Sequence, residues 1–578
     1  MAFKINNRSL SFKPGQTILD VARQNNISIP SLCYHPDFEV KANCRLCVVE
    51  IKGSGKLVTA CSTPAQDGLS VFTESERVKK ARKLNLELII DEHTKKCGDC
   101  TSAFNCELLK FSRDYQIDAD RFVSRKPGRQ TYKFGRAVEL DSSQCIDCRN
   151  CVDACQAQGI GYLEIVKSGH HQEIVPSRSK NKTCVYCGQC TVHCPAASAQ
   201  EIADWPAVEK ILQDKKKIVV AQFAPSVRVS IGEEFGLAPG VNCEGQTISA
   251  LKALGFKAVF DTNFGADLTT MVEVDELIKR LSDQKAVWPM FTSCCPAWVA
   301  YVEFYHPELI PNLTSARSPQ LHLAALIKTY WAQRRGLNPK NIVLVSIMPC
   351  TAKKQEITRP QLKANGRQLV DYVLTVREFA YLLKRKQIDL SKLPIAGIDS
   401  PLNQGSGAAA IYGATGGVME SALRTAAVKL NTKGRSKLKM TNLKFKEVNG
   451  LTGFKEASLE LAGKKIHIGI VDGLGNFAAL LPKLAKYHYI EVMACPGGCL
   501  GGGGQPLVIN DKIRAARRQG LSAIDQKRPQ RSAHENQAML AAYDYLRSKA
   551  STRKLLHTQF NPSRALVPQK LVKKIKKN

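Results

Sequence analysis

The sequence predicts a multidomain α+β protein, and three observations point to this fold class. The chain has 578 residues, enough for several domains that each bury a core. Twenty of its 21 cysteines fall into four sets, and the first three sets end at Cys194. From about residue 215, apolar β-branched segments alternate with helical patterns, which is typical of an α/β domain with largely parallel sheets.

Residues 1–78 are predicted to form a small β-rich domain. Two short apolar segments, Phe3–Ile5 and Leu10–Phe12, flank a turn, and Ile18–Gln24 has the pattern of a short helix. The domain carries four cysteines with cluster-like spacing: Cys33, Cys44, Cys47 and Cys61. Four thiolates suffice for a 2Fe–2S cluster. Zinc is the alternative, although the usual pair of C-x2–4-C knuckles is missing.

Residues 79–118 are predicted to form a second metal-binding module. Its candidate ligands are one histidine and three cysteines: His93, Cys97, Cys100 and Cys106. Zinc accepts such a set. A 4Fe–4S cluster accepts it as well, and a neutral imidazole in place of a thiolate raises the reduction potential of a cluster.

Residues 136–205 contain the run C-x2-C-x2-C-x3-C twice, 39 residues apart. This run is the signature of bacterial two-cluster ferredoxins, in which the fourth cysteine of each run ligates the other cluster. The expected sets are Cys145, Cys148, Cys151 and Cys194, and Cys184, Cys187, Cys190 and Cys155. Gln156 stands where a proline usually follows the first run, which affects the local turn rather than ligation.

Residues 215–515 are predicted to form a larger α/β domain. Its expected strands are Ile218–Ala221, Ala258–Phe260, Ile342–Ile347, Ile466–Val471 and Tyr489–Val492. The remaining cysteine motifs follow directly on such apolar segments, at Cys294–Cys295, Cys350 and Cys495–Cys499. Ligands in open α/β sheets gather beyond the carboxyl ends of strands, so we expect these cysteines to meet at one site.

With its motifs TSCCPAW, MPCTAKK and MACPGGC, the chain resembles multi-cluster [FeFe] hydrogenases over about residues 1–515. The resemblance implies a β-grasp ferredoxin-like module, a His/Cys cluster module, a two-cluster ferredoxin module and a two-lobed α/β catalytic domain. It implies one 2Fe–2S cluster, three 4Fe–4S clusters and an H-cluster. The H-cluster joins a 4Fe–4S subcluster to a two-iron unit that carries carbon monoxide, cyanide and an azadithiolate. The implied subcluster ligands are Cys295, Cys350, Cys495 and Cys499, with Cys499 bridging to the two-iron unit.

The resemblance also assigns residues around the two-iron unit. A buried cyanide acceptor needs donors, and the ammonium of Lys353 would supply a charge-assisted hydrogen bond. The other implied contacts are Ala224, Pro225, Ser226, Gln320, Met348 and Met493. Ala297 stands where glycine is common in the family and Tyr412 where phenylalanine is common, which bears on fine tuning of rate or gas access.

The spare thiol of Cys294 passes protons in the family, because a thiol loses and regains a proton near neutral pH. The implied route to solvent is Glu273, Thr314, Glu276 and Arg280, with Thr314 where serine is usual. Taken without the resemblance, Glu273 and Glu276 fit a solvated helix face.

Two C-terminal features complete the chain. Residues 525–562, with a helical stretch from His534 to about Ser548, resemble the hydrogenase small subunit that wraps the catalytic domain, and residues 563–578 are expected to be a basic tail. Gly473–Ala478 matches a G-x-G-x-x-A dinucleotide fingerprint before a predicted apolar helix. The next strand runs into Cys495, so we expect no nucleotide there.

The formal net charge of +32 predicts an acidic protein partner rather than a nucleic acid. Lys and Arg are dispersed apart from runs such as Lys433–Lys437 and Lys570–Lys577, and no nucleic-acid-binding motif is present. We expect an acidic ferredoxin or flavodoxin as electron carrier, dedicated maturation proteins, no membrane span, and a cytoplasmic or other reducing, anaerobic compartment. The alternatives are the catalytic subunit of an NAD(P)-linked or electron-bifurcating complex with a flavoprotein, a hydrogen sensor, and an iron–sulfur assembly relative.

Overall fold

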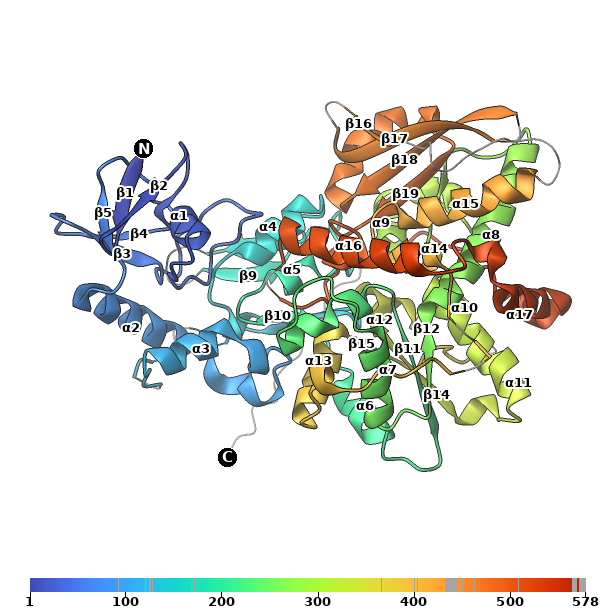
Figure 1. Ribbon diagram of the computed structural model, residues 1–578, viewed down its shortest axis with the longest axis horizontal. Coiled ribbons are helices and arrows are strands. Elements are labelled where there is room, and N and C mark those ends of the chain that lie inside the picture. Colours follow the sequence, from blue (N-terminus) through green and yellow to red (C-terminus); the bar gives the residue numbers. More distant parts are fainter. Residues whose placement is uncertain are drawn as a thin grey trace.

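A computed structural model gives the fold of the chain (Figure 1). It describes all residues except 92, 120, 124, 125, 127, 168, 170, 171, 365, 400, 403, 432–444, 449, 450, 462, 508, 564–568 and 571–578. The basic run 433–437 therefore lies outside the described residues, as does the predicted tail apart from residues 563, 569 and 570.

The N-terminal module is a five-stranded mixed sheet in the order β2-β1-β5-β3-β4 with one helix. Its strands are β1 (Ala2–Ile5), β2 (Arg8–Ser11), β3 (Val48–Ile51), β4 (Leu57–Thr59) and β5 (Ser70–Phe72). Helix α1 (Ile18–Gln24) has the predicted bounds, because Thr17 and Asp20 form a capping box at its start. The prediction of a small β-rich domain is confirmed.

The next module is helical. Helix α2 (Glu76–Ile90) leads to His93, and two 3-10 turns, η1 (Thr94–Asp99) and η2 (Ala103–Asn105), carry the following cysteines up to α3 (Glu107–Asp114).

The repeated cysteine runs have matching backbones. Asp147 and Arg149 adopt positive φ angles of 54° and 66°, and their counterparts Tyr186 and Gly188 adopt 65° and 69°. Helix α4 (Asn150–Ala157) continues past Cys155, whereas α5 (Gln189–Val192) ends before Pro195, because a residue before proline avoids the helical region. The runs lie between the strands β6 (Thr131–Phe134), β7 (Val138–Asp141), β8 (Leu163–Val166), β9 (Glu173–Pro176) and β10 (Ala199–Glu201).

The part of the chain from about residue 215, which corresponds to the expected catalytic domain and is called the catalytic part below, contains two sheets with helices between them (Figure 1). The first is parallel, in the order β12-β11-β14-β15, with strands β11 (Ile218–Phe223), β12 (Ala258–Asp261), β14 (Ile342–Met348) and β15 (Tyr372–Thr375). The second is mixed, in the order β13-β19-β18-β17-β16, with strands β13 (Met290–Phe291), β16 (Lys446–Val448), β17 (Leu451–Leu461), β18 (Lys464–Asp472) and β19 (Tyr489–Met493). The five predicted strands are confirmed.

Two expectations for this part were incomplete or wrong. Strands β16 and β17 were not predicted, and β17 pairs antiparallel with β18, so this sheet is not largely parallel. The apolar helix expected after Gly473 is a 3-10 segment, η15 (Ala478–Lys486), with Pro482 inside it. Proline has no N–H to donate and clashes with the preceding turn, which disfavours a regular α-helix.

Helices connect and cover the strands of the two sheets. They include α7 (Glu244–Ala253), α8 (Thr262–Ser282), α9 (Pro296–Tyr305), α10 (Pro319–Leu326), α13 (Val376–Arg385), α15 (Gly417–Asn431), α16 (Asp511–Lys527) and α17 (Gln537–Ser548). Helix α17 confirms the predicted helical stretch, although His534 and Glu535 lie in the preceding 3-10 turn. Helix α16 runs across the catalytic part, and α17 packs against α8 (Figure 1).

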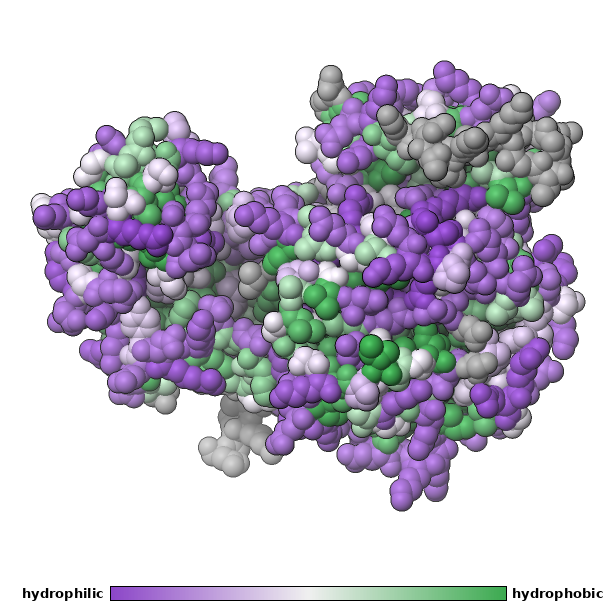
Figure 2. Space-filling model, viewed as in Figure 1, coloured by the Kyte–Doolittle hydropathy of each residue, from purple (hydrophilic) through white to green (hydrophobic). Residues whose placement is uncertain are grey.

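The exterior is mostly polar. Hydrophilic residues dominate the face seen in Figure 2, on both the N-terminal module and the catalytic part. Among the helices that the structure describes, none combines the length and the apolar character needed to cross a bilayer.

Candidate active site

Three loops that follow strands meet in one cavity of the catalytic part. Cys294 and Cys295 follow β13, Cys350 follows β14, and Cys495 follows β19. Strands β13 and β19 are parallel neighbours, while β14 belongs to the other sheet. The carboxyl ends of the strands in both sheets therefore deliver cysteines to a cavity of about 80 Å³.

The residues assigned to the H-cluster all line this cavity. They are Cys295, Cys350, Cys495, Cys499, Cys294, Lys353, Ala224, Pro225, Ser226, Gln320, Met348 and Met493. Ala297 and Tyr412, which differ from the residues common in the family, line the cavity as well. Thr262 was not foreseen; it enters the lining because β12 ends at Asp261, directly before it.

The thiols of this cavity suit a metal cluster. None of its cysteines is in a disulfide. Burial raises the pKa of Cys350 to about 12, and the charge of Cys295 adds to this effect. Burial and then the charge of Cys350 also raise the pKa values of Cys495 and Cys499. Converging thiolates in a buried site repel one another unless a cation neutralises them, so the donor set fits iron–sulfur ligation.

Unpartnered polar atoms also fit a bound group with polar ligands. Ser226 Oγ, Thr262 Oγ1 and Gln320 Oε1 are buried and have no hydrogen-bond partner among the described residues. A buried polar group left in this state costs about 1–3 kcal/mol. All three residues line the cavity, where a polar ligand would satisfy them.

Lys353 is oriented by Glu356, which the sequence analysis missed. Lys353 Nζ donates to Glu356 Oε2 at 2.9 Å and to the Cys294 carbonyl oxygen at 3.1 Å. Gln320 Nε2 donates to the same Glu356 oxygen at 2.9 Å. Burial is the largest single effect and opposes the ammonium form, but the charge and hydrogen bond of Glu356, together with the charges of Cys350 and Cys294, outweigh it and raise the pKa of Lys353. The i, i+3 spacing of Lys353 and Glu356 on α12 (Ala352–Glu356) was the available signal.

The residues assigned to the proton route lie outside the cavity lining. Glu273, Glu276 and Arg280 lie on α8, and Thr314 lies on a nearby loop. Thr314 Oγ1 donates to Glu276 Oε2 at 2.8 Å, and Arg280 Nη2 donates to Glu276 Oε1 at 2.8 Å. Thr314, Glu276 and Arg280 are therefore one hydrogen-bonded group.

Glu273 is fully buried, and neither of its oxygens has a hydrogen-bond partner among the described residues. Burial raises its pKa to about 8, the Glu276 and Glu491 charges contribute, and the nearby Ser293 amide and Tyr489 hydroxyl, neither of them in hydrogen-bond geometry, lower it only in part. Burial followed by the Glu273 charge raises the pKa of the Cys294 thiol. Glu273 is thus a protonated carboxyl near neutral pH, coupled electrostatically to both Cys294 and Glu276.

The first two cysteine sets are each brought together. Cys44 N donates to Cys33 Sγ at 3.5 Å, and the pKa of the Cys61 thiol is raised by the neighbouring Cys47 thiol, by burial and by the charges of Cys33 and Cys44. In the second module, His93, Cys97 and Cys100 line one cavity, and Cys106 lies outside its lining. His93 Nδ1 lies 2.8 Å from the Gln144 carbonyl oxygen, an acceptor, so Nδ1 carries the proton and Nε2 is free to ligate.

The repeated runs exchange their fourth cysteines. After burial, the main cause, the charge of Cys194 raises the pKa values of the first-run thiols Cys145, Cys148 and Cys151. The charge of Cys155 acts in the same way on the second-run thiols Cys184, Cys187 and Cys190. Each fourth thiol therefore lies with the three thiols of the other run. Cys187 also adjoins the cavity where the three motif loops meet, because Cys495 Sγ donates to its carbonyl oxygen at 3.8 Å.

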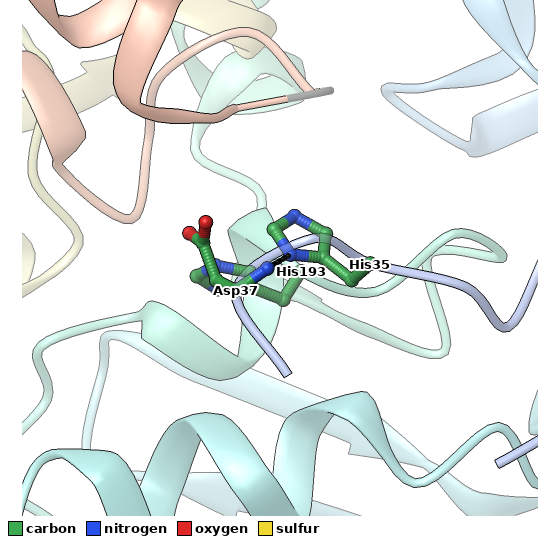
Figure 3. Close-up of side chains that lie close together, drawn as sticks. All are labelled: His35, Asp37 and His193. Carbon is green, nitrogen blue, oxygen red and sulfur yellow. Dashed lines mark hydrogen bonds and ion pairs between the residues drawn. The ribbon is translucent and has the colours of Figure 1, made fainter. Parts of the chain in front are cut away.

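Another group of potential ligands joins two modules (Figure 3). His35 and Asp37 come from the N-terminal module, and His193 comes from the end of α5. His193 Nδ1 donates to the Gln189 carbonyl oxygen at 2.7 Å. Asp37 pairs with Arg514 at 3.2 Å, and its amide donates to His35 Nδ1 at 3.2 Å. These polar atoms are already engaged and a guanidinium stands beside them, so the group is a contact between modules.

Comparisons with known proteins agree with this geometry. The model of the family described as iron only hydrogenase large subunit, C-terminal domain, matches residues 217–503. A 2Fe-2S iron-sulfur cluster binding domain matches residues 1–76, and an iron hydrogenase small subunit matches residues 511–563.

Two relatives are similar over nearly their whole lengths. The NADP-reducing hydrogenase subunit HndD of Solidesulfovibrio fructosivorans is 38% identical over 97% of this chain and 98% of its own. Iron hydrogenase 1 of Clostridium pasteurianum is 37% identical over 93% of this chain and 95% of its own. A solved apo [FeFe]-hydrogenase from Chlamydomonas reinhardtii superposes with a TM-score of 0.56 and 36% identity, over 62% of this chain and 99% of that one.

Proposed function

The chain belongs to the iron-only hydrogenase family, and from this premise we propose that it interconverts protons and hydrogen with electrons from an acidic ferredoxin or flavodoxin. The observation that carries the proposal is the cavity in which four thiols from three loops meet Lys353, Ser226 and the spare thiol of Cys294. Proton reduction at pH 7 lies near roughly −410 mV and plant-type ferredoxins near about −400 mV, so the exchange needs little driving force.

The residues of the cavity would hold an H-cluster. Cys295, Cys350, Cys495 and Cys499 would ligate the 4Fe–4S subcluster. Lys353 and the unpartnered Ser226 hydroxyl would donate to cyanide ligands, and Gln320, Met348, Met493, Ala224 and Pro225 would pack around the two-iron unit. When bound, this unit supplies the site where protons and electrons combine and where hydrogen is split.

The chain itself would deliver the protons. In hydrogen production, a proton would pass from Glu276 by way of Thr314 to Glu273, and from the Glu273 carboxyl to Cys294 Sγ. The hydrogen bond between Thr314 and Glu276 and the raised pKa of Glu273 support this order. Arg280 would hold Glu276 in place through their 2.8 Å hydrogen bond.

The N-terminal modules would carry electrons through one 2Fe–2S and three 4Fe–4S clusters. We assign residues 1–78, 79–118 and 136–205 to these modules, 215–515 to catalysis and 525–562 to the wrapping segment, with a basic tail at 563–578. The contact of Cys495 with the Cys187 carbonyl supports an electron exit from the second cysteine run. Such clusters require maturation proteins and a reducing, anaerobic setting such as the cytoplasm.

A second candidate is the catalytic subunit of an NAD(P)-linked complex. The similarity to HndD over nearly the whole chain favours it. A flavoprotein would then dock on the N-terminal modules. Hydrogen-dependent NADP reduction that requires a copurifying flavoprotein would support this alternative over ferredoxin as the direct partner.

Infrared spectroscopy tests the proposed function. The matured protein should show carbon monoxide and cyanide vibrations and evolve hydrogen from reduced ferredoxin. A matured sample that lacks these bands and has no activity would instead fit an assembly relative.

Cys294→Ser tests the proton relay. Because a serine hydroxyl does not titrate near neutral pH, we expect hydrogen evolution to fall at least 100-fold with the infrared bands retained. Near-normal turnover by this variant would exclude the relay role of Cys294.

A further inference from the structure

The C-terminal segment reaches the outer end of the proposed proton route. Residues 556–558 pair with the loop that carries Thr314: Arg317 N donates to the Leu556 carbonyl at 3.2 Å, and Thr558 N donates to the Ser315 carbonyl at 2.8 Å. His557 lies opposite Ala316 in this pairing. The backbone therefore fixes His557 beside the loop.

The side chains continue this contact inward. His557 Nδ1 lies 3.0 Å from Ser315 Oγ, and Ser315 Oγ donates to Glu276 Oε2 at 2.9 Å. Because the serine proton is directed at the carboxylate, the serine oxygen accepts from the imidazole. A continuous chain of hydrogen bonds thus runs from His557 to Glu276.

This chain of hydrogen bonds gives the proposed proton route a group at its outer end that can exchange protons with water. Arg280, the charged group that donates to Glu276, is always protonated and does not exchange protons near neutral pH. Glu276 is only 18% exposed, whereas His557 is exposed. Imidazole is the side chain suited to proton exchange between pH 5 and 8.

Charged groups on two neighbouring elements face His557. Glu276 and Asp275 lie on α8, and Arg317 lies on the paired loop and donates from Nε to the His557 carbonyl at 2.9 Å. Partial burial of the ring lowers the pKa of His557 below its usual 6.5, Glu276 and Asp275 oppose this, and Arg317 adds to it. The imidazole is therefore mostly neutral at pH 7 and still accepts protons from water.

We propose that His557 exchanges protons between solvent and Glu276, so that the C-terminal segment supplies the solvent end of the proton route. The inference rests on the proposed function. For hydrogen production, imidazolium Nδ1–H gives its proton to Ser315 Oγ, whose own proton moves to Glu276 Oε2; the neutral imidazole then takes a proton from water or buffer. Hydrogen uptake reverses these transfers.

The test compares His557→Gln with His534→Gln in the matured enzyme. Glutamine keeps a hydrogen-bonding side chain but does not titrate. His534 is a matched control, because it lies in the same C-terminal part and bonds to Thr425 instead of the route. We expect His557→Gln to lose about tenfold in hydrogen evolution, to lose the pH dependence that the parent shows below pH 6.5, and to regain activity with added imidazole. His534→Gln should behave as the parent enzyme does.

Ser315→Ala separates the relay from a structural effect. It should show a similar loss that imidazole does not restore, because the link to Glu276 is broken. Infrared bands of the cluster should stay unchanged in all three variants. Parental rates and pH profile in His557→Gln, together with an inactive Cys294→Ser, would overturn the role of His557 and leave the hydrogenase proposal intact. A fully active Cys294→Ser would instead overturn the route itself.

Discussion

At the scale of single residues, the site depends on carboxyl groups that the protein shields from water. Glu273 has no hydrogen-bond partner among the described residues, and burial raises its pKa to about 8. Glu356, in contrast, accepts from both Lys353 and Gln320. One carboxyl is therefore arranged to hold and release a proton, and the other to orient two residues of the cavity.

We predict that Glu273→Gln blocks proton delivery and stabilises the protein at alkaline pH. The amide does not titrate, so hydrogen evolution should fall at least 100-fold. The carboxyl ionises near pH 4.5 when unfolded and near 8 when folded, so its contribution to stability falls as pH rises from about 4.5 to 8 and is then constant. At about 1.4 kcal/mol per pKa unit, the variant gains at most about 5 kcal/mol above pH 8.

Thermal melting of the variant and parent at pH 5 and pH 9 measures this difference. Glu460→Gln, at an exposed position of β17, is the control and should change neither activity nor melting. An equal melting difference at both pH values would contradict the assignment of a raised pKa to Glu273.

At the scale of elements, one buried arginine fixes the turn that carries part of the cavity lining. Arg228 Nη2 donates to Asp261 Oδ1 at 2.6 Å, and Nη1 donates to Glu244 Oε2 at 2.8 Å. Arg228 Nε donates to the Pro225 carbonyl at 3.1 Å. The end of β12, the start of α7 and the turn after β11 are thereby joined by one side chain.

Arg228→Met should destabilise the catalytic part by about 3–5 kcal/mol, because it leaves the buried carboxylate of Asp261 without its cation and leaves Glu244 with Arg528 alone. The turn at Ala224–Ser226 should loosen, so the infrared bands per protein should decrease. Arg77→Met, which removes an exposed pair with Glu50, is the control and should cost at most about 1 kcal/mol. Denaturant unfolding and infrared intensity check both expectations, and equal effects of the two variants would refute the role of Arg228.

At the scale of the whole molecule, charge favours a negatively charged electron carrier. The formal net charge is +32, and bound clusters offset only part of it. Such a surface accelerates encounter with an acidic protein, and salt screens the attraction.

We therefore expect hydrogen evolution with subsaturating ferredoxin to fall about tenfold between roughly 20 and 300 mM salt. With methyl viologen, a small cation, the rate should not fall over the same range. Initial rates at fixed carrier concentration measure both. A ferredoxin rate insensitive to salt would argue against electrostatic docking and favour a permanent flavoprotein subunit.

The sequence by itself determined the five predicted strands and α1, which the structure confirms. It also predicted the ligand sets, which stay predictions. Cysteine spacing and apolar periodicity are local properties of the sequence, so they can be recognised without the structure. Strand β17 was not predicted from the sequence. The alternation of Leu459, Glu460 and Leu461 marks a strand only once the core that the two leucines pack against is known. Only the tertiary structure decided that Glu356 orients Lys353. It also decided that Ser315 links Glu276 to His557, which lies 242 residues after Ser315 in the sequence. The i, i+3 spacing of Lys353 and Glu356 was a local signal, but it does not encode that Gln320 also donates to Glu356. The link to His557 depends on the direction of side chains from distant elements, which no spacing in the chain encodes.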